Sequence, residues 1–156
     1  RAKLSSRIFN TFKEINNMEI NYTMLVVAAV VQFVFGAVWY SPLMFGKIWM
    51  SIMEVGHYSK EELQKMQKTM MPFMALQFFM TLITTWVLAS NLSFSNITGS
   101  AAYFYAFFMW FGYMMPVTVS AVIFGSTKRH NWLKQIGIML GMQLIGLMLA
   151  AFILTM

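Results

Sequence analysis

Three glutamines, Gln32, Gln77 and Gln143, interrupt long apolar stretches of the sequence. A side-chain amide surrounded by hydrocarbon needs hydrogen-bond partners, so it faces a neighbouring helix or a space that holds polar molecules. We therefore predict that the three amides point into the interior of a helix bundle. There they either bond across helices or line a path for a small solute. Further hydroxyl partners in the same stretches are Thr81, Thr84, Thr85, Thr118 and Ser120.

A second concentration of polar and aromatic residues is the segment WYSPLMFGKIW, residues 39–49. Tryptophan and tyrosine are typical at the depth of lipid headgroups, and the proline favours the end of a helix. This pattern predicts a membrane anchor at a helix exit. An alternative is that its polar groups bind an anionic or headgroup-like ligand. The candidate ligand or headgroup site consists of Trp39, Tyr40, Ser41, Lys47 and Trp49.

The residue types that support catalysis or metal binding are sparse. The chain contains no cysteine, which excludes disulfides, thiolate nucleophiles and the common zinc and iron–sulfur sites. His57 and His130 lie in different loops, and their spacing from Glu54, Glu61 and Glu62 fits no metal-binding pattern. The apolar stretches contain no aspartate or glutamate, which argues against a proton- or sodium-coupled pump. We predict a non-enzymatic protein with no catalytic residue, cofactor or metal.

The elements that position these residues are predicted to be membrane-spanning helices. The sequence is 59% hydrophobic and 10% charged, whereas soluble domains carry about 25% charged residues. A spanning helix needs about 20 predominantly apolar residues. We predict an all-α polytopic membrane protein in which residues 18–156 form one bundle of four transmembrane helices. The spans cover residues 22–40, 71–89, 101–124 and 132–156.

The connection between the first and second spans is long enough to hold a further helix. Apolar residues recur in it at helical spacing, which is typical of an amphipathic helix lying in the membrane interface. Next, Ser59 and Glu62 have the spacing of a capping box, which predicts a second helix that continues into the second span with a kink near Pro72. The residues on the apolar face of the interfacial helix are Phe45, Ile48, Trp49, Ile52 and Met53.

The remaining segments set the turns and the orientation. Residues 90–100 are uncharged and rich in Ser, Asn and Gly, which predicts a tight polar hairpin. Residues 1–17 form a basic extension, either the remnant of an organellar presequence or a foreign upstream segment. Every other lysine and arginine follows the first or third span, so both termini are expected on the outer side. These cations are Lys47, Lys60, Lys65, Lys68, Lys128, Arg129 and Lys134.

Small residues recur along the last span. Gly137 and Gly141 form a GxxxG step, and Gly146 continues the strip. Such strips let two helices approach closely inside a membrane. We expect close packing of this span, either within one chain or between two copies of it.

The segment GAVWYSPLMFGKIWM, residues 36–50, resembles the signature of a family of small four-helix integral membrane proteins of unknown function. In that family a WYSPLxFGKxW pattern ends the first helix. Family members often have an acidic residue shortly after the third span, where this chain has Gly125, Ser126 and Thr127. The resemblance implies a four-helix membrane domain without an assigned activity.

For function, we expect a scaffold, an accessory subunit or a homo-oligomer, because polar chemistry inside the spans is sparse and small-residue packing faces are present. A first alternative is a small-solute channel or facilitator lined by the glutamines. A second is a subunit of an organellar inner-membrane complex. The expected partner is membrane lipid with anionic headgroups on the basic side, and no nucleic acid. The expected location is a bacterial plasma membrane or an organellar inner membrane.

Overall fold

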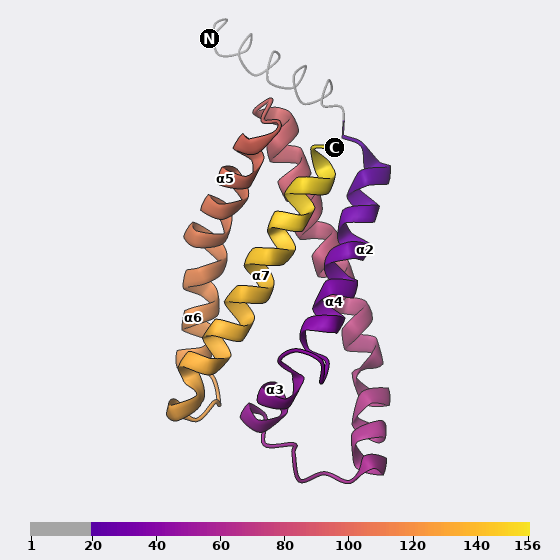
Figure 1. The fold of residues 1–156 in the computed structure, drawn as a ribbon, viewed down its shortest axis with the longest axis vertical. Coiled ribbons are helices and arrows are strands. Elements are labelled where there is room, and N and C mark those ends of the chain that lie inside the picture. The colour runs from indigo at the N-terminus through magenta and orange to yellow at the C-terminus, as the bar shows by residue number, and fades with distance from the viewer. Residues whose placement is uncertain (1–19) are drawn as a thin grey trace, which may run out of the picture.

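The computed structural model describes residues 20–156, so the predicted extension over residues 1–17 lies outside the described part of the chain. Residues 20–156 form helices and turns and no strand, which confirms the predicted all-α class. Four of the helices are long and apolar enough to cross a membrane. In chain order the helices (Figure 1) are α2 (Tyr22–Trp39), α3 (Gly46–Ile52), α4 (Lys60–Phe94), α5 (Ser100–Met109), the π-helix η1 (Trp110–Met114), α6 (Met115–Ile123), the 3₁₀ turn η2 (Arg129–Asn131) and α7 (Trp132–Leu154).

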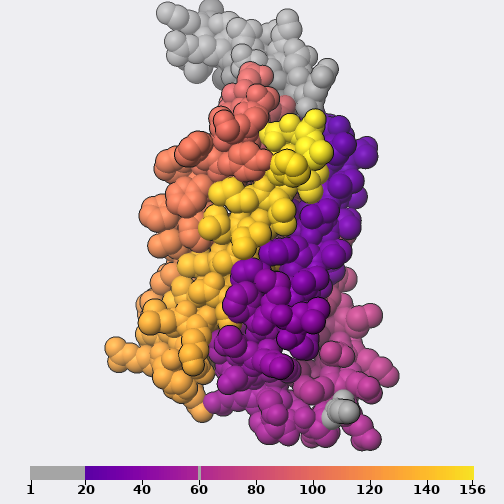
Figure 2. Space-filling model, viewed as in Figure 1, coloured from indigo at the N-terminus to yellow at the C-terminus, as the bar shows by residue number. Residues whose placement is uncertain are grey.

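Helix α7 is the centre of the bundle. It packs against α2, α4, α5 and α6, whereas α4 and α6 share little contact within the described residues. Figure 1 shows α7 crossing between α2 and the α5–α6 helix, with α4 behind it. On the face shown in Figure 2, α7 and α2 meet without a gap. The space between α4 and α6 is therefore bounded by α7 rather than closed by direct contact of its two walls.

The main apolar core lies toward the end of the bundle that holds the C-terminus. Its buried residues come largely from the last turns of α4 and α7 and the first turns of α5, which meet at that end. Many are alanines, and small side chains allow helices in a membrane to approach closely. We call this cluster the apolar plug, and it consists of Ala28, Leu88, Leu92, Ala102, Ala106, Leu147, Ala150 and Ala151.

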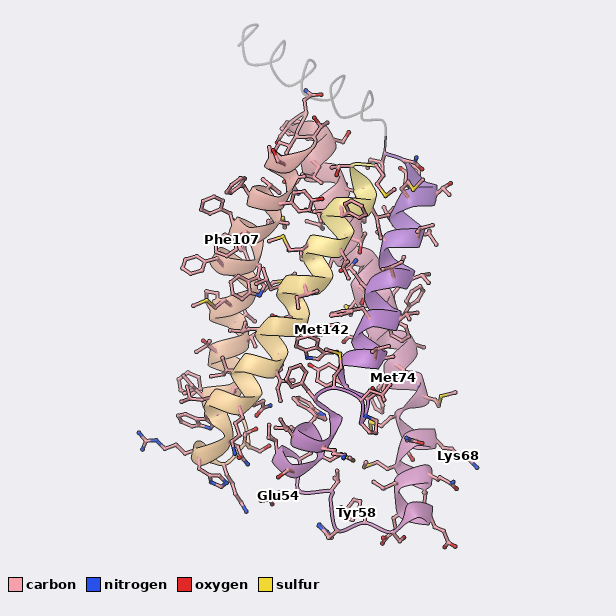
Figure 3. The ribbon with its side chains drawn as sticks, viewed as in Figure 1. Glu54, Tyr58, Lys68, Met74, Phe107 and Met142 are labelled. Carbon is pink, nitrogen blue, oxygen red and sulfur yellow. The ribbon has the colours of Figure 1, made fainter. Side chains whose placement is uncertain are left out.

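Helix α4 is longer than a membrane crossing requires. Its capping box forms as predicted: the Ser59 hydroxyl accepts from the Glu62 amide at 3.3 Å, and the Ser59 amide donates to Glu62 Oε2 at 2.7 Å. The helix then runs for 35 residues through Pro72, which corresponds to about 52 Å at about 1.5 Å per residue. The hydrocarbon layer is only about 30 Å thick. The first turns of α4 therefore extend beyond it, and Lys68 projects from this part of the helix in Figure 3.

The predicted hairpin at residues 90–100 is shorter than expected, because α4 continues to Phe94. Asn91, within this last part of α4, is hydrogen-bonded both inside the helix and to α5. Its side-chain amide donates to the Val87 carbonyl at 2.7 Å, and its Oδ1 accepts from the Tyr105 hydroxyl at 2.9 Å. A polar residue that the composition assigns to a loop thus bonds α4 to α5.

The third span contains a π-turn that the sequence analysis did not predict. The Met115 amide donates to the Trp110 carbonyl, five residues back. Pro116 follows directly and has no amide hydrogen, which releases one carbonyl of the preceding turn from the regular helical pattern. The wider turn lies immediately beside the site described below.

The predicted short helix between the first two spans is present as α3. Of the residues predicted on its apolar face, Ile52 is buried against Trp39 and Ile138, and Phe45 and Trp49 are partly buried. The other two, Ile48 and Met53, are exposed. The helix therefore docks on the end of the bundle by its last turn and leaves one apolar edge uncovered.

Candidate functional site

Trp39, at the end of α2, is a packing anchor. Its indole N–H donates to the Ile138 carbonyl of α7 at 3.1 Å. The ring is buried and lies 4.5 Å from the Phe45 ring and 5.5 Å from the Phe35 ring, centre to centre. The residue thus fixes where α2 crosses α7.

The polar groups that follow Trp39 are used within a turn. The Ser41 hydroxyl donates to the Val38 carbonyl at 2.6 Å and accepts from the Leu43 amide at 3.3 Å. A side chain at Gly46 would lie 2.6 Å from the Ser41 carbonyl, so this close approach requires glycine.

The other members of the predicted headgroup site are an aromatic pair and an exposed lysine. The Tyr40 and Trp49 rings meet edge to face at 4.9 Å, and Lys47 is exposed. A ligand site at residues 39–49 remains a prediction.

The three intramembrane glutamines, by contrast, share one cavity of about 380 Å³. Its walls come from α4 on one side and η1 and α6 on the other, and α2 and α7 contribute the remainder. We call it the glutamine cleft. Its lining consists of Gln32, Gln77, Met80, Thr81, Thr84, Tyr113, Met114, Val117, Thr118, Met142, Gln143, Gly146 and Leu147.

Gln32 joins α2 to α4 at the deep end of the cleft. Its Nε2 donates to the Thr85 hydroxyl at 2.6 Å and to the Ala28 carbonyl at 3.3 Å. The side chain is buried, at 6% exposure. Gly146 of α7 faces it, because an added methyl group there would lie 3.8 Å from Gln32 Oε1.

The other two glutamines occupy different positions in the cleft. Gln143 of α7 pairs with Thr118 of α6: the Thr118 hydroxyl and the Gln143 amide atoms lie 3.0 and 3.1 Å apart. Gln77 is exposed on α4, and within residues 20–156 its side chain forms no hydrogen bond. It lies eight residues before Thr85, or about 12 Å nearer the basic end at about 1.5 Å per residue.

The cleft is closed at one end. Leu147 both lines it and belongs to the apolar plug. From the plug the cleft runs along α4 past Thr84 to Gln77, toward the end of the bundle that carries the basic loops. None of the described residues that line it is charged. The cleft is therefore an uncharged recess, lined by both polar and apolar side chains, whose deep end lies against the apolar plug.

Sequence reasoning identified the glutamines and threonines of the cleft but missed Tyr113. This side chain is 74% exposed at the rim and lies within the π-turn. The signal available in the sequence was Pro116, since a proline inside a span disturbs the helical hydrogen bonds of the turn before it.

The three glycines of α7 do not act as one strip. An added methyl group on Gly141 would lie 3.0 Å from Trp39 Cζ2, and Gly146 faces Gln32. Around Gly137 no heavy atom lies within 4 Å of that position among the described residues. Gly36 of α2 meets the Met142 Cε at 2.7 Å in the same way, and Figure 3 shows Met142 between α7 and α2. The close contact is thus between α2 and α7, and Gly137 is left outside it.

At the basic end, Glu54 forms an ion pair with Lys128, which connects the end of α3 to the loop before α7. The hydrogen bond and the positive charge of Lys128 lower the pKa of Glu54 from its ordinary value of 4.5. In the part of the chain that the structure describes, no group of three His, Cys, Asp or Glu side chains is arranged to bind a metal.

Comparison with known proteins identifies a family. The model of the family described as "Protein of unknown function (DUF1761)" matches residues 23–155. No curated protein matches the chain, and no solved structure matches it. The match includes all four spans. The chain therefore belongs to DUF1761, a family of helical proteins of unknown function.

Proposed function

We propose that this protein is a non-enzymatic integral membrane protein that binds a small, uncharged, polar molecule in the glutamine cleft. The single observation that carries the proposal is that Gln32, Gln77 and Gln143, from three separate spans, line one cavity of about 380 Å³. Small-molecule sites usually measure about 300 to 1,000 Å³ and hold a few convergent polar groups.

Interhelical bonding accounts for only part of this arrangement. Gln32 and Gln143 each bond a threonine on another helix, which is a sufficient structural role for both. Gln77 has no such partner within residues 20–156, although an unpaired amide in hydrocarbon is costly. A polar occupant of the cleft satisfies this amide.

The shape of the cleft favours binding over open passage. The apolar plug blocks the deep end of the cleft, so a solute that enters from the basic end has no polar exit at the plug. Passage across the membrane would require α4 and α5 to separate at the plug. Binding is the part of a facilitator's function that this geometry supports.

The test uses the purified chain in lipid nanodiscs, with glycerol and urea as probes and ligand-observed NMR as the readout. The variant Gln32→Leu plus Gln143→Leu removes two of the three amides and keeps similar side-chain volume. Gln67→Leu is the matched control, because Gln67 is an exposed glutamine of α4 outside the cleft. We expect the double variant to lose binding and the control to retain it. Equal binding by all three proteins would refute the proposal.

A second candidate, a scaffold or homo-oligomer, is favoured by one feature of α4. Residues 67–77 are exposed on every side of the helix over three turns. Part of this segment lies within the second span, where a partner helix or lipid covers it. A monomer by native mass spectrometry in mild detergent and in nanodiscs would remove this candidate. The alternative of an organellar complex subunit depends on residues 1–17, outside the described range.

We also propose that the basic end contacts anionic headgroups and faces inward. Lys47, Lys128, Arg129 and Lys134 are all exposed at that end. Lysine and arginine in short loops favour the inner side of a membrane and attract anionic lipid. In that orientation the Gln77 end of the cleft is nearer the inner side.

A further inference from the structure

We infer that the glutamine cleft selects a neutral ligand that supplies hydrogen-bond donors, such as a polyol or an unsubstituted amide, over one that supplies acceptors alone. This inference rests on the proposed function and specifies its ligand. It follows from counting which donors and acceptors of the cleft are already used by the protein itself.

The threonine hydroxyl protons along α4 are already committed. Thr81 Oγ1 donates to the Gln77 carbonyl at 2.9 Å, and Thr84 Oγ1 donates to the Met80 carbonyl at 3.0 Å. A hydroxyl has one proton and two lone pairs. Each of these threonines therefore offers the cleft acceptor lone pairs and no donor.

The N–H donors of Gln32 are likewise already used within the protein. Both N–H groups of its amide donate, one to Thr85 and one to the Ala28 carbonyl. Its Oε1 has no hydrogen-bond partner within residues 20–156 and lies beside Gly146, where the absence of a side chain leaves space. The deep end of the cleft thus presents a carbonyl acceptor.

Donors are fewer at this depth. One N–H of Gln143 is bonded to Thr118, and the Thr118 proton is directed at Gln143 Oε1. This leaves a single amide N–H of Gln143. The remaining donors, the Gln77 amide and the Tyr113 hydroxyl, are on exposed side chains at the rim. Acceptors therefore outnumber donors where a ligand would be most fully enclosed.

The lack of charged side chains in the described lining argues against an ionic ligand. A cation would find no carboxylate among the described lining residues, and an anion would find no lysine, arginine or cluster of N–H donors. Either ion would lose its hydration without compensation. The volume of about 380 Å³ corresponds to roughly thirteen water molecules at about 30 Å³ each, so a three-carbon polyol or urea enters with water.

The experiment compares urea and glycerol with tetramethylurea, which keeps the carbonyl acceptor of urea but has no N–H. Binding to the full chain in nanodiscs is measured by ligand-observed NMR at non-denaturing concentrations. Thr84→Val removes the hydroxyl acceptor at nearly constant volume. Thr69→Val is the matched control, because Thr69 donates to the Lys65 carbonyl at 3.1 Å in the same way but lies outside the cleft.

We expect urea and glycerol to bind and tetramethylurea not to bind. Thr84→Val should weaken urea binding roughly three- to tenfold, the range for one lost hydrogen bond, and Thr69→Val should leave it unchanged. If Thr84→Val does not fold, Thr81→Val tests the same step.

Three outcomes overturn the inference in distinguishable ways. Binding of tetramethylurea as tight as that of urea refutes the donor requirement and leaves the proposed function standing. A preference for urea that survives Thr84→Val and Thr81→Val together shows that the threonine acceptors are not its cause. Failure of all three probes to bind removes the proposed function as well.

Discussion

The sharpest prediction concerns two glycines of α7 that the sequence treats alike. Replacing Gly137 with alanine should stabilise the protein, and replacing Gly141 with alanine should destabilise it. Among the described residues, a methyl group on Gly137 meets no heavy atom within 4 Å, whereas one on Gly141 lies 3.0 Å from Trp39 Cζ2 and 3.4 Å from Trp39 Cη2. A GxxxG pattern by itself predicts the same effect at both positions.

The magnitudes follow from opposing contributions. Removing glycine from a helix interior stabilises by about 0.5 to 1 kcal/mol, and this is the expected effect of Gly137→Ala. Overpacking costs about 1 to 3 kcal/mol, and the Trp39 indole has little room to move because it is bonded to Ile138 and packed against Phe35. The net effect of Gly141→Ala is a destabilisation of about 0.5 to 2 kcal/mol.

A double-mutant cycle separates this clash from other causes. Trp39→Phe removes the ring atoms that the new methyl group would meet, so Gly141→Ala should become neutral or stabilising in that background. The coupling energy should reach about 1 kcal/mol, within the range for residues in contact. The measurement is reversible unfolding by SDS in mixed micelles, followed by far-UV circular dichroism. Additive single effects, or a Gly141→Ala as stable as Gly137→Ala, would show that the contact between α2 and α7 is assigned incorrectly.

Three further predictions address other parts of the fold. The pKa of Glu54 is lowered by Lys128. The stabilising contribution of this ion pair is therefore present above about pH 4.5 and is lost as the pH falls below that value. Glu54→Gln should remove this pH dependence from thermal melts. Ser59→Ala should fray the first turn of α4, seen as faster amide hydrogen exchange there, with no change in the bundle. Trp110→Phe removes an indole N–H that donates to an α7 carbonyl at 3.1 Å and should cost about 0.6 to 1.7 kcal/mol, measured in the same mixed micelles; an unchanged unfolding midpoint would contradict that bond.

Short-range features of the sequence determined where the helices of this protein begin and end. Hydropathy placed α2 and α7 to within two residues of their observed ends, because the requirement for apolar length applies to each span separately. The capping box at Ser59 was equally readable, since its partners are three residues apart. Asn91 was misassigned to a loop because its partner, Tyr105, lies on another helix.

Only the tertiary structure decided how those elements face one another. Gln32 bonds Thr85 across 53 positions, and Trp39 bonds Ile138 across 99. Sequence periodicity predicts that an amide turns inward but does not give the rotation and tilt of the neighbouring helices, which are set by packing. The apolar, polar and small residues thus defined four helices. The packing of α7 against the other three spans brought its own Gln143 together with Gln32 and Gln77 in one cleft, and it separated Gly141 from Gly137.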